Sequence, residues 1–286
     1  MKIKLHLLIV FLSFSAFSQN IIWEKVTSRE ITKNKFVERD NFPNQFDLYQ
    51  ISTSVLKNTL HQSPNRLQSN SSKVIISIPN LNGELERFQM FEFSNFAPQL
   101  QAQYPEIRSY VGQGIEDKTA VLRLSSDPRG FQGMILRANN ESEFFEPYST
   151  DGSVYAFYDS ERKNGDLPFV CSTQDLALNN ELKSATTNQR SNSGELLTFR
   201  LALSCNGEYA QYFGGSDAQA LAGMNATMTR VNGVFENDFA IHMNIISNNN
   251  LVVYTNPSTD PYSTNLGSWN GQLQNTLTNI IGEANY

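Results

Sequence analysis

The chain has few of the side chains that most often build catalytic centres. Its 286 residues include two cysteines and three histidines, of which only His61 and His242 lie beyond residue 18. A zinc site needs three or four His, Cys or carboxylate ligands at about 2.0 to 2.3 Å from the metal. Neither histidine lies at ligand spacing from a second His or Cys, and no His-Glu-x-x-His occurs. We therefore interpret both as solvated or hydrogen-bonded side chains, and assign no catalytic residue, metal ligand or bound cofactor within the chain.

Other catalytic signatures are also missing. The sequence has no Gly-x-Ser-x-Gly elbow for serine chemistry. Gly214 and Gly215 lack the order and the lysine of a phosphate-binding loop, so we interpret them as the turn that enters a helix. Glu84 and Glu86 fall on the same face of an expected strand, where charged side chains most simply form a solvated surface. None of these residues is assigned a catalytic role.

Beyond its N-terminus the chain has no long apolar run. Lys2 and Lys4 precede an apolar stretch at residues 7–12, and small residues follow at 15–18. This order is typical of a secretory signal peptide cleaved near Ser18–Gln19. No later segment approaches the roughly 20 apolar residues of a membrane helix. We expect a secreted protein that has no membrane association after the signal is removed.

An excess of basic charge is absent as well. The chain has 22 Lys and Arg against 28 Asp and Glu, a net charge of −6, and the expected signal peptide holds two of the lysines and no acid. A protein that follows a phosphate backbone needs a basic stripe, whereas here the basic residues are scattered singly. The composition therefore argues against nucleic-acid binding.

Two cysteines cannot form a disulfide scaffold, so the fold must depend on buried apolar area. The hydrophobic content of 40% and the aromatic content of 11% can supply it. The length of the mature chain favours two domains over one.

The first part of the chain has mainly the period of two that is typical of strands. Residues 74–78 and 84–93 flank an Asn-Gly pair and predict a hairpin. Residues 119–124 and 131–136 flank Asp127-Pro-Arg-Gly130 and predict a second one. Short aromatic strands at 143–148 and 153–158 complete a β-rich domain, which we place at residues 19–165.

A linker is expected at residues 166–195. Its stretch from 183 to 194 has no aromatic residue and no apolar residue larger than alanine, so it cannot bury enough surface to order itself. Arg190 is the only basic residue between Lys183 and Arg200, and is the candidate processing site.

The period changes to that of helices and strands in residues 196–286. Strands are expected at 196–203, 239–246 and 251–255, and helices after Ser216 and from Trp269. The fold class is α+β, with a β-rich domain followed by an incomplete α/β domain. Because we expect that domain to lack part of its sheet, we also expect an exposed apolar patch, made by Leu221, Met228, Leu273 and Leu277.

Several separated segments resemble one protein family. They are residues 74–88, 104–114, 198–210 and 224–236, and they resemble the reprolysin-like (M12B-type) zinc metalloproteases exported by Bacteroidetes bacteria. The resemblance implies a β-rich propeptide followed by the opening of a metzincin catalytic domain, with zinc as cofactor and proteins or peptides as substrates. The family's His-Glu-x-x-His-x-x-Gly-x-x-His helix, which binds the zinc, would lie beyond Tyr286. We therefore expect an N-terminal fragment of a secreted zinc metalloendopeptidase precursor, with a propeptide or latency function and no activity alone.

A second interpretation comes from a different class. The chain could be a non-catalytic secreted inhibitor, or a module for adhesion or carbohydrate binding. The reading frame after the codon for Tyr286 distinguishes the two, because a continuation into the zinc-binding helix would show a precursor fragment.

The two cysteines carry the remaining open question. A propeptide thiol at Cys171 could occupy the fourth position on the zinc of a complete precursor and keep it latent. Alternatively, Cys171 and Cys205 form a disulfide, which would close a loop of about 34 residues and contribute roughly 3 to 4 kcal/mol. That bridge would span the candidate processing site and keep the propeptide attached after the cut.

Overall fold

The computed structural model describes residues 23–27, 45–138, 142–159 and 195–286. The expected signal peptide, Cys171, Arg190 and nearly all of the expected linker lie outside these residues. Helices and strands are both abundant, which confirms the α+β class. The domain limits at 165 and 196 stay predictions.

The first unit is a nine-stranded sheet in which all neighbours are antiparallel, in the order β1-β2-β9-β8-β7-β6-β5-β4-β3. Both expected hairpins are confirmed, as β3 with β4 and as β6 with β7. The strands are β1 (Trp23–Val26), β2 (Asp47–Ile51), β3 (Ile75–Pro79), β4 (Leu85–Glu92), β5 (Arg108–Gly114), β6 (Val121–Asp127), β7 (Gly130–Leu136), β8 (Glu143–Pro147) and β9 (Val154–Asp159).

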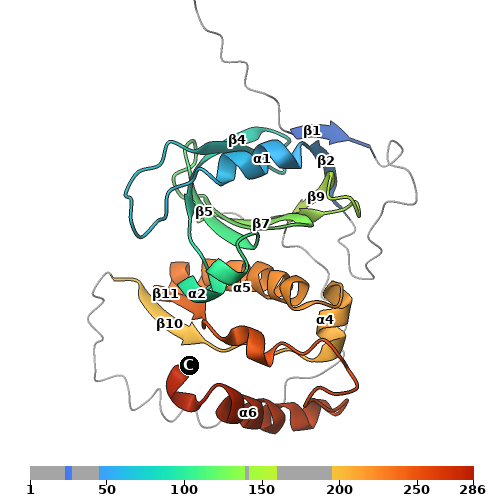
Figure 1. The fold of residues 1–286 in the computed structure, drawn as a ribbon. Coiled ribbons are helices and arrows are strands. Elements are labelled where there is room, and N and C mark those ends of the chain that lie inside the picture. The colour runs from blue at the N-terminus through green and yellow to red at the C-terminus, as the bar shows by residue number, and fades with distance from the viewer. Residues whose placement is uncertain (1–22, 28–44, 139–141, 160–194) are drawn as a thin grey trace, which may run out of the picture.

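This sheet curls around helix α1 (Thr53–Leu60), so that its main core lies on the inner face (Figure 1). The two edge strands lie close to each other: Nε1 of Trp23 on β1 donates a hydrogen bond to the carbonyl of Ser77 on β3 at 2.8 Å. The Trp23 ring also packs edge-on against Phe157. α1 adds Leu56 to the same core.

The second unit begins with a parallel pair of strands joined by helices. β10 (Leu197–Leu201) pairs with β11 (Ile241–Ile245), and between them run α4 (Gly207–Phe213) and α5 (Asp217–Phe239). Ser216 caps α5 by accepting the N–H of Gln219, as its spacing predicts. After β11 follow the 3-10 helices η2 (Asn249–Val252), η3 (Leu266–Ser268) and η4 (Glu283–Asn285), with α6 (Trp269–Ile280) before the last of them.

The expected strand at 251–255 is wrong. Residues Asn249–Val252 form the short helix η2 instead. The side chain of Asn249 bonds both the N–H and the carbonyl of Leu203, at 2.7 and 2.9 Å. Val253 forms a single isolated bridge with Cys205, and the pairing does not extend into a strand.

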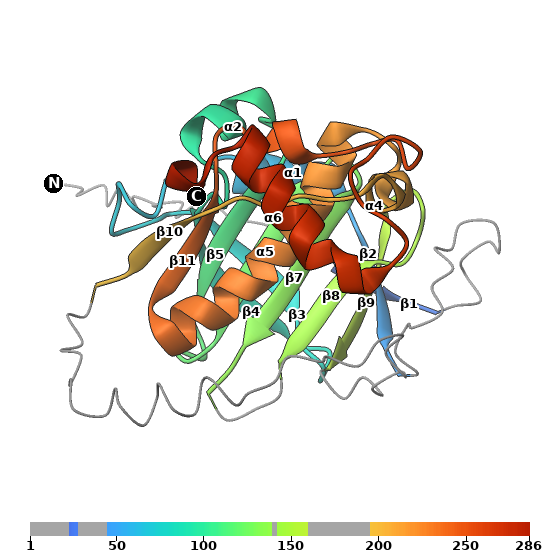
Figure 2. The ribbon, with the colours of Figure 1, turned by 90° about the horizontal axis from the view of Figure 1, so that it is seen from below.

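Helix α5 belongs to the second unit and packs on the first unit. It crosses the outer face of the nine-stranded sheet near β5, β6 and β7, and α6 lies on the far side of the β10–β11 pair (Figures 1 and 2). A short helix of the first unit, α2 (Pro98–Gln103), contributes Leu100 to a core shared with α5. The elements form successive layers, of which α5 is the central one.

The expected apolar patch is mostly buried, so that prediction is wrong. Leu221 and Met228 of α5 pack with Phe96 in the shared core. Leu277 of α6 is buried in a smaller cluster below β11, and only Leu273 keeps 37% exposure. The expectation failed because the first unit, rather than a longer sheet, covers α5. Within the described ranges, no helix is both long and apolar enough to cross a bilayer.

If α5 depends on the first unit to cover its apolar face, shortening a side chain on that face should destabilise the chain. We expect Leu221→Ala to lower the free energy of unfolding by about 2 to 5 kcal/mol, since it leaves a cavity in the shared core. Leu251→Ala removes the same atoms from a side chain that is 54% exposed and should change stability by less than about 0.5 kcal/mol. Urea unfolding of both variants measures the difference, and equal losses would contradict the burial.

Candidate functional site

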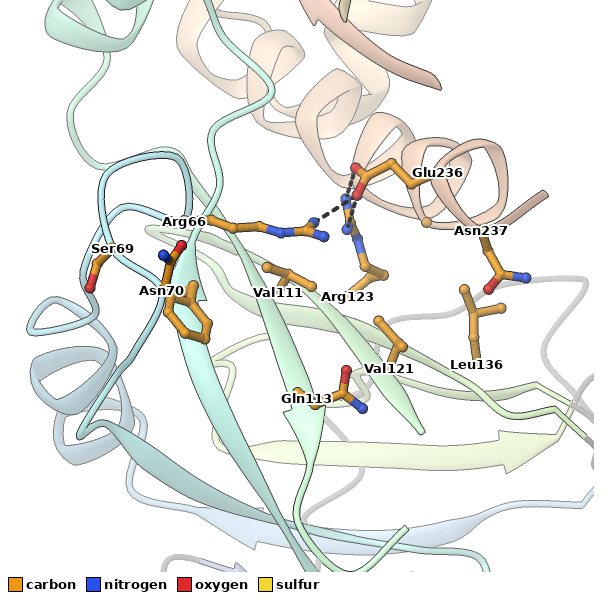
Figure 3. Close-up of a pocket in the computed structure, with 12 residues that line it drawn as sticks. Arg66, Ser69, Asn70, Val111, Gln113, Val121, Arg123, Leu136, Glu236 and Asn237 are labelled. Atoms are coloured by element: carbon orange, nitrogen blue, oxygen red, sulfur yellow. Dashed lines mark hydrogen bonds and ion pairs between the residues drawn. The ribbon is translucent and has the colours of Figure 1, made fainter. Parts of the chain in front are cut away.

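A cluster of charged side chains occupies the contact between the sheet and the end of α5. Glu236 lies in the last turn of α5 and is the centre of the cluster (Figure 3). Arg123 comes from β6, Arg66 from the loop after α1, and His242 from β11. The side chains of Glu236 and Arg123 keep only 8% and 4% exposure.

The geometry within the cluster is tight. The Arg123 guanidinium donates two hydrogen bonds to Glu236, from Nη1 to Oε2 at 2.9 Å and from Nη2 to Oε1 at 2.6 Å. Arg66 donates from Nη1 to Oε2 at 2.8 Å, and Nδ1 of His242 lies 2.9 Å from Oε1. Such paired guanidinium–carboxylate bonds are among the strongest that a protein forms.

A glycine in the preceding turn of α5 permits this approach. A Cβ on Gly233 would lie 2.8 Å from Cγ of Arg123 and 2.9 Å from Cε of Met134. The missing side chain lets the helix sit directly on β6 and β7. It also brings Glu236, at the electronegative end of the helix dipole, within reach of the Arg123 guanidinium that neutralises it.

The surroundings keep Glu236 ionised. Burial raises the pKa of the carboxyl group. The hydrogen bond from His242 and the charge and hydrogen bonds of Arg123 outweigh this effect and lower the pKa to about 2. The ring of Phe93 supports the cluster from the side: it stacks on His242 with 4.2 Å between ring centroids, and the guanidinium of Arg66 lies 4.9 Å from its centroid. A carboxylate with so low a pKa is a weak base, so this arrangement is unsuited to proton abstraction. It holds the end of α5 against β6.

A pocket of about 440 Å³ opens beside the cluster. Figure 3 shows Arg66 and Arg123 at one side of it, both pointing toward Glu236. Nε of Arg123 is buried and has no hydrogen-bond partner among the described residues. The remaining wall mixes polar and apolar residues of both units: Ser69, Asn70, Phe91, Val111, Gln113, Val121, Leu136, Gly233 and Asn237.

The described residues do not fit a zinc centre. No three His, Cys, Asp or Glu side chains among them are grouped so that they could hold a metal ion. Both ring nitrogens of His242 face protein atoms, since Nε2 lies 3.3 Å from the carbonyl of Ser94. His61 is an exposed residue at the end of α1. We therefore derive no catalytic step from this part of the chain.

The residues that the sequence analysis singled out lie in different places. His242 is a hydrogen-bonded side chain, as predicted, but it is buried. Gly214 and Gly215 form the turn between α4 and α5, as predicted. Glu86 is half-buried and accepts a hydrogen bond from Arg137 at 2.7 Å, so it is less solvated than expected.

The cysteine question keeps its alternatives. Cys205 is 7% exposed, forms an isolated bridge with Val253, and has no disulfide partner among the described residues. Cys171 and Arg190 lie outside the described residues, so the latency thiol, the disulfide and the processing site stay predictions.

The charged cluster was missed by the sequence analysis. Arg123 and Arg66 are 113 and 170 residues away from Glu236 in the chain. No local spacing joins them, and a single glutamate near the end of a helix is indistinguishable from a solvated one. Only the packing of α5 on the sheet brings the three side chains together.

Comparisons with known proteins connect the second unit to a family. Residues 196–286 match the model of the metallo-peptidase family M12B, reprolysin-like. No curated protein matches the chain. The family match supports the resemblance for the second unit and implies proteins as the family's substrates, whereas the nine-stranded sheet lies outside the matched residues.

The low pKa of Glu236 makes a prediction for acid stability. Its folded pKa of about 2 is below the ordinary value of 4.5, so its contribution is complete above pH 4.5 and is lost as the pH falls toward 2. The contribution is about 3 kcal/mol. We expect Glu236→Gln to lower thermal stability at pH 7 and to flatten its dependence between pH 4.5 and 2. Glu116→Gln, in an exposed pair with Arg87, is the control, and an equal flattening there would contradict the assignment.

A further prediction concerns Cys205. Burial raises the pKa of its thiol from the ordinary value of 9.0 to about 11, so at pH 8 its thiolate fraction is roughly a hundredfold below that of an ordinary thiol. We expect iodoacetamide to alkylate Cys205 far more slowly in the native chain than in urea, as followed by peptide mass spectrometry. Mass spectrometry without reductant detects the alternative, because a disulfide with Cys171 removes both thiol hydrogens.

Proposed function

We propose that the chain is the N-terminal part of a secreted zinc metalloendopeptidase precursor. In this proposal residues 19–165 are a propeptide and residues 196–286 form the first part of the catalytic domain. The match of residues 196–286 to the reprolysin-like family supports the peptidase assignment. The signal-peptide pattern at residues 1–18 supports export.

The packing of α5 is the observation that carries the propeptide role. The first unit covers the apolar face of the helix and neutralises Glu236 with Arg123. A propeptide that guides folding must provide contacts of this kind, because an isolated catalytic fragment would expose them. In the complete precursor, zinc would be held by residues other than those described here and would supply the water-activating chemistry of the family.

Activation would follow from a cut in the linker. Cleavage at Arg190 would leave the two units joined by non-covalent contacts, unless Cys171 and Cys205 are bridged. The propeptide would then leave by dissociation, with the Cys171 thiol as a candidate for holding the enzyme latent before the cut.

The test uses the reading frame continued past the codon for Tyr286. We expect the continued protein to hydrolyse casein only after cleavage in residues 183–194, and hydrolysis to be abolished by a chelator and restored by zinc. Arg190→Gln should delay processing without changing the folded precursor.

The chain of residues 19–286 alone should show no such hydrolysis. A stop codon directly after Tyr286, together with zinc-independent binding to a protease or a carbohydrate, would contradict the proposal and favour the inhibitor or adhesion module.

A further inference from the structure

We propose that α5 and β11 together form a socket for an extended peptide in which an asparagine is followed by an aromatic residue. Residues 94–97 of the first unit fill this socket in the folded chain, with Asn95 and Phe96 as the two anchors. The socket would make recognition between the units independent of the linker. The proposal goes beyond the peptidase assignment, because it names the peptide that the second unit binds.

The backbone of the segment extends the sheet of the second unit. β11 pairs with β10 on one edge. On its other edge, the N–H of Ile245 donates to the carbonyl of Asn95 at 2.7 Å, and the N–H of Ala97 donates to the carbonyl of Ile245 at 2.8 Å. These two bonds form a parallel bridge between Phe96 and Ile245. Adding a strand to an open sheet edge is a common mode of peptide recognition.

Asn95 supplies the polar anchor and is fully buried. Its Nδ2 donates to Oδ1 of Asn225 at 3.0 Å and to Oγ1 of Thr229 at 2.8 Å. Its Oδ1 accepts from Nδ2 of Asn232 at 2.9 Å. Because the site both accepts from and donates to the side chain, only a primary amide of this length satisfies it. Aspartate would lose both donated bonds and bury a charge.

The second unit itself holds one side of the socket in place. The side chain of Asn232 bonds both the N–H and the carbonyl of Met243 on β11, each at 2.9 Å. It thus occupies the edge of β11 next to the position of Ile245. These two hydrogen bonds fix the amide of Asn232 so that its Nδ2 faces the incoming asparagine, without any contribution from the first unit.

Phe96 supplies the apolar anchor. Its side chain is 2% exposed and lies in the shared core with Leu221, Met224 and Ile245. Adjacent residues of an extended segment point to opposite sides, so Asn95 can enter the polar part of the socket while Phe96 enters the apolar part. This two-sided fit selects the order asparagine then aromatic.

The test uses the full chain with a specific protease site in place of residues 184–189, cut after purification. Rebinding of the two halves is followed by fluorescence transfer at protein concentrations near their dissociation constant. We expect Asn95→Ala and Asn95→Asp each to weaken association by at least a hundredfold. Asn58→Ala on α1, exposed and on the other side of the sheet, is the matched control and should leave association unchanged.

A double-mutant cycle isolates the contact from general destabilisation. If Asn95 and Asn232 interact, the double variant with alanine at both positions should associate about as weakly as the single variant that has the lower affinity. Additive losses would contradict the socket.

A synthetic peptide of residues 92–104 provides a measurement on the unaltered cut protein, which also serves if the variants do not fold. At millimolar concentration it should reduce rebinding of the halves, whereas the same peptide with aspartate in place of Asn95 should not. Equal effects of the two peptides, or none from either, would overturn the proposal. Neither readout involves hydrolysis, so its failure is distinct from a failure of the peptidase assignment.

Discussion

The burial of helix α5 between the nine-stranded sheet and the β10–β11 pair is the constraint on which the rest of the structure depends. A helix of 23 residues that carries Leu221, Met224 and Met228 on one face needs an apolar partner there. The parallel β10–β11 pair is too small to cover all of it, and the convex face of the nine-stranded sheet provides the remainder. The place of α5 in turn fixes where β11 lies, because the two pack together. η2 and α6 pack against each other in the next layer and follow the position of β11.

This central contact is unusually polar for a core. Arg123, Glu236 and His242 are buried in it, and so is the amide of Asn95. Buried polar groups contribute less to affinity than an apolar core of the same area would, because each must be desolvated first. They do impose register, since a shifted helix would leave charges and amides without partners. A contact of this composition is therefore more specific, and less tight, than a purely apolar contact of the same area would be.

The sequence predicts local structure well and the central contact poorly, for physical reasons. The hairpins β3–β4 and β6–β7 depend on turn residues close in the chain, and the start of α5 depends on Ser216 and Gln219. Asn225, Thr229 and Asn232 recur at intervals of four and three residues on a face that is otherwise apolar, which was an available signal for a polar partner. Their partner, Asn95, is 130 residues away from Asn225, and nothing local identifies it. The strand expected at 251–255 failed because residues 249–252 turn into η2, which leaves Val253 with a single bridge to Cys205.

The distribution of polar groups between the two units differs in a way that bears on separation. Glu236 keeps His242 as a partner within the second unit, and Asn232 keeps Met243. Arg66 and Arg123, by contrast, both belong to the first unit and share the carboxylate across the contact. If the units part, Glu236 keeps His242 and Asn232 keeps Met243, but Asn225 loses its bonds to the first unit. The two guanidinium groups of the first unit become free to be hydrated. Departure of the first unit would take both guanidinium groups away from Glu236 and would relieve the desolvation of Arg123 at the same time. Both units thus lose polar partners on separation, Asn95 in the first and Asn225 in the second, and only hydration can replace them.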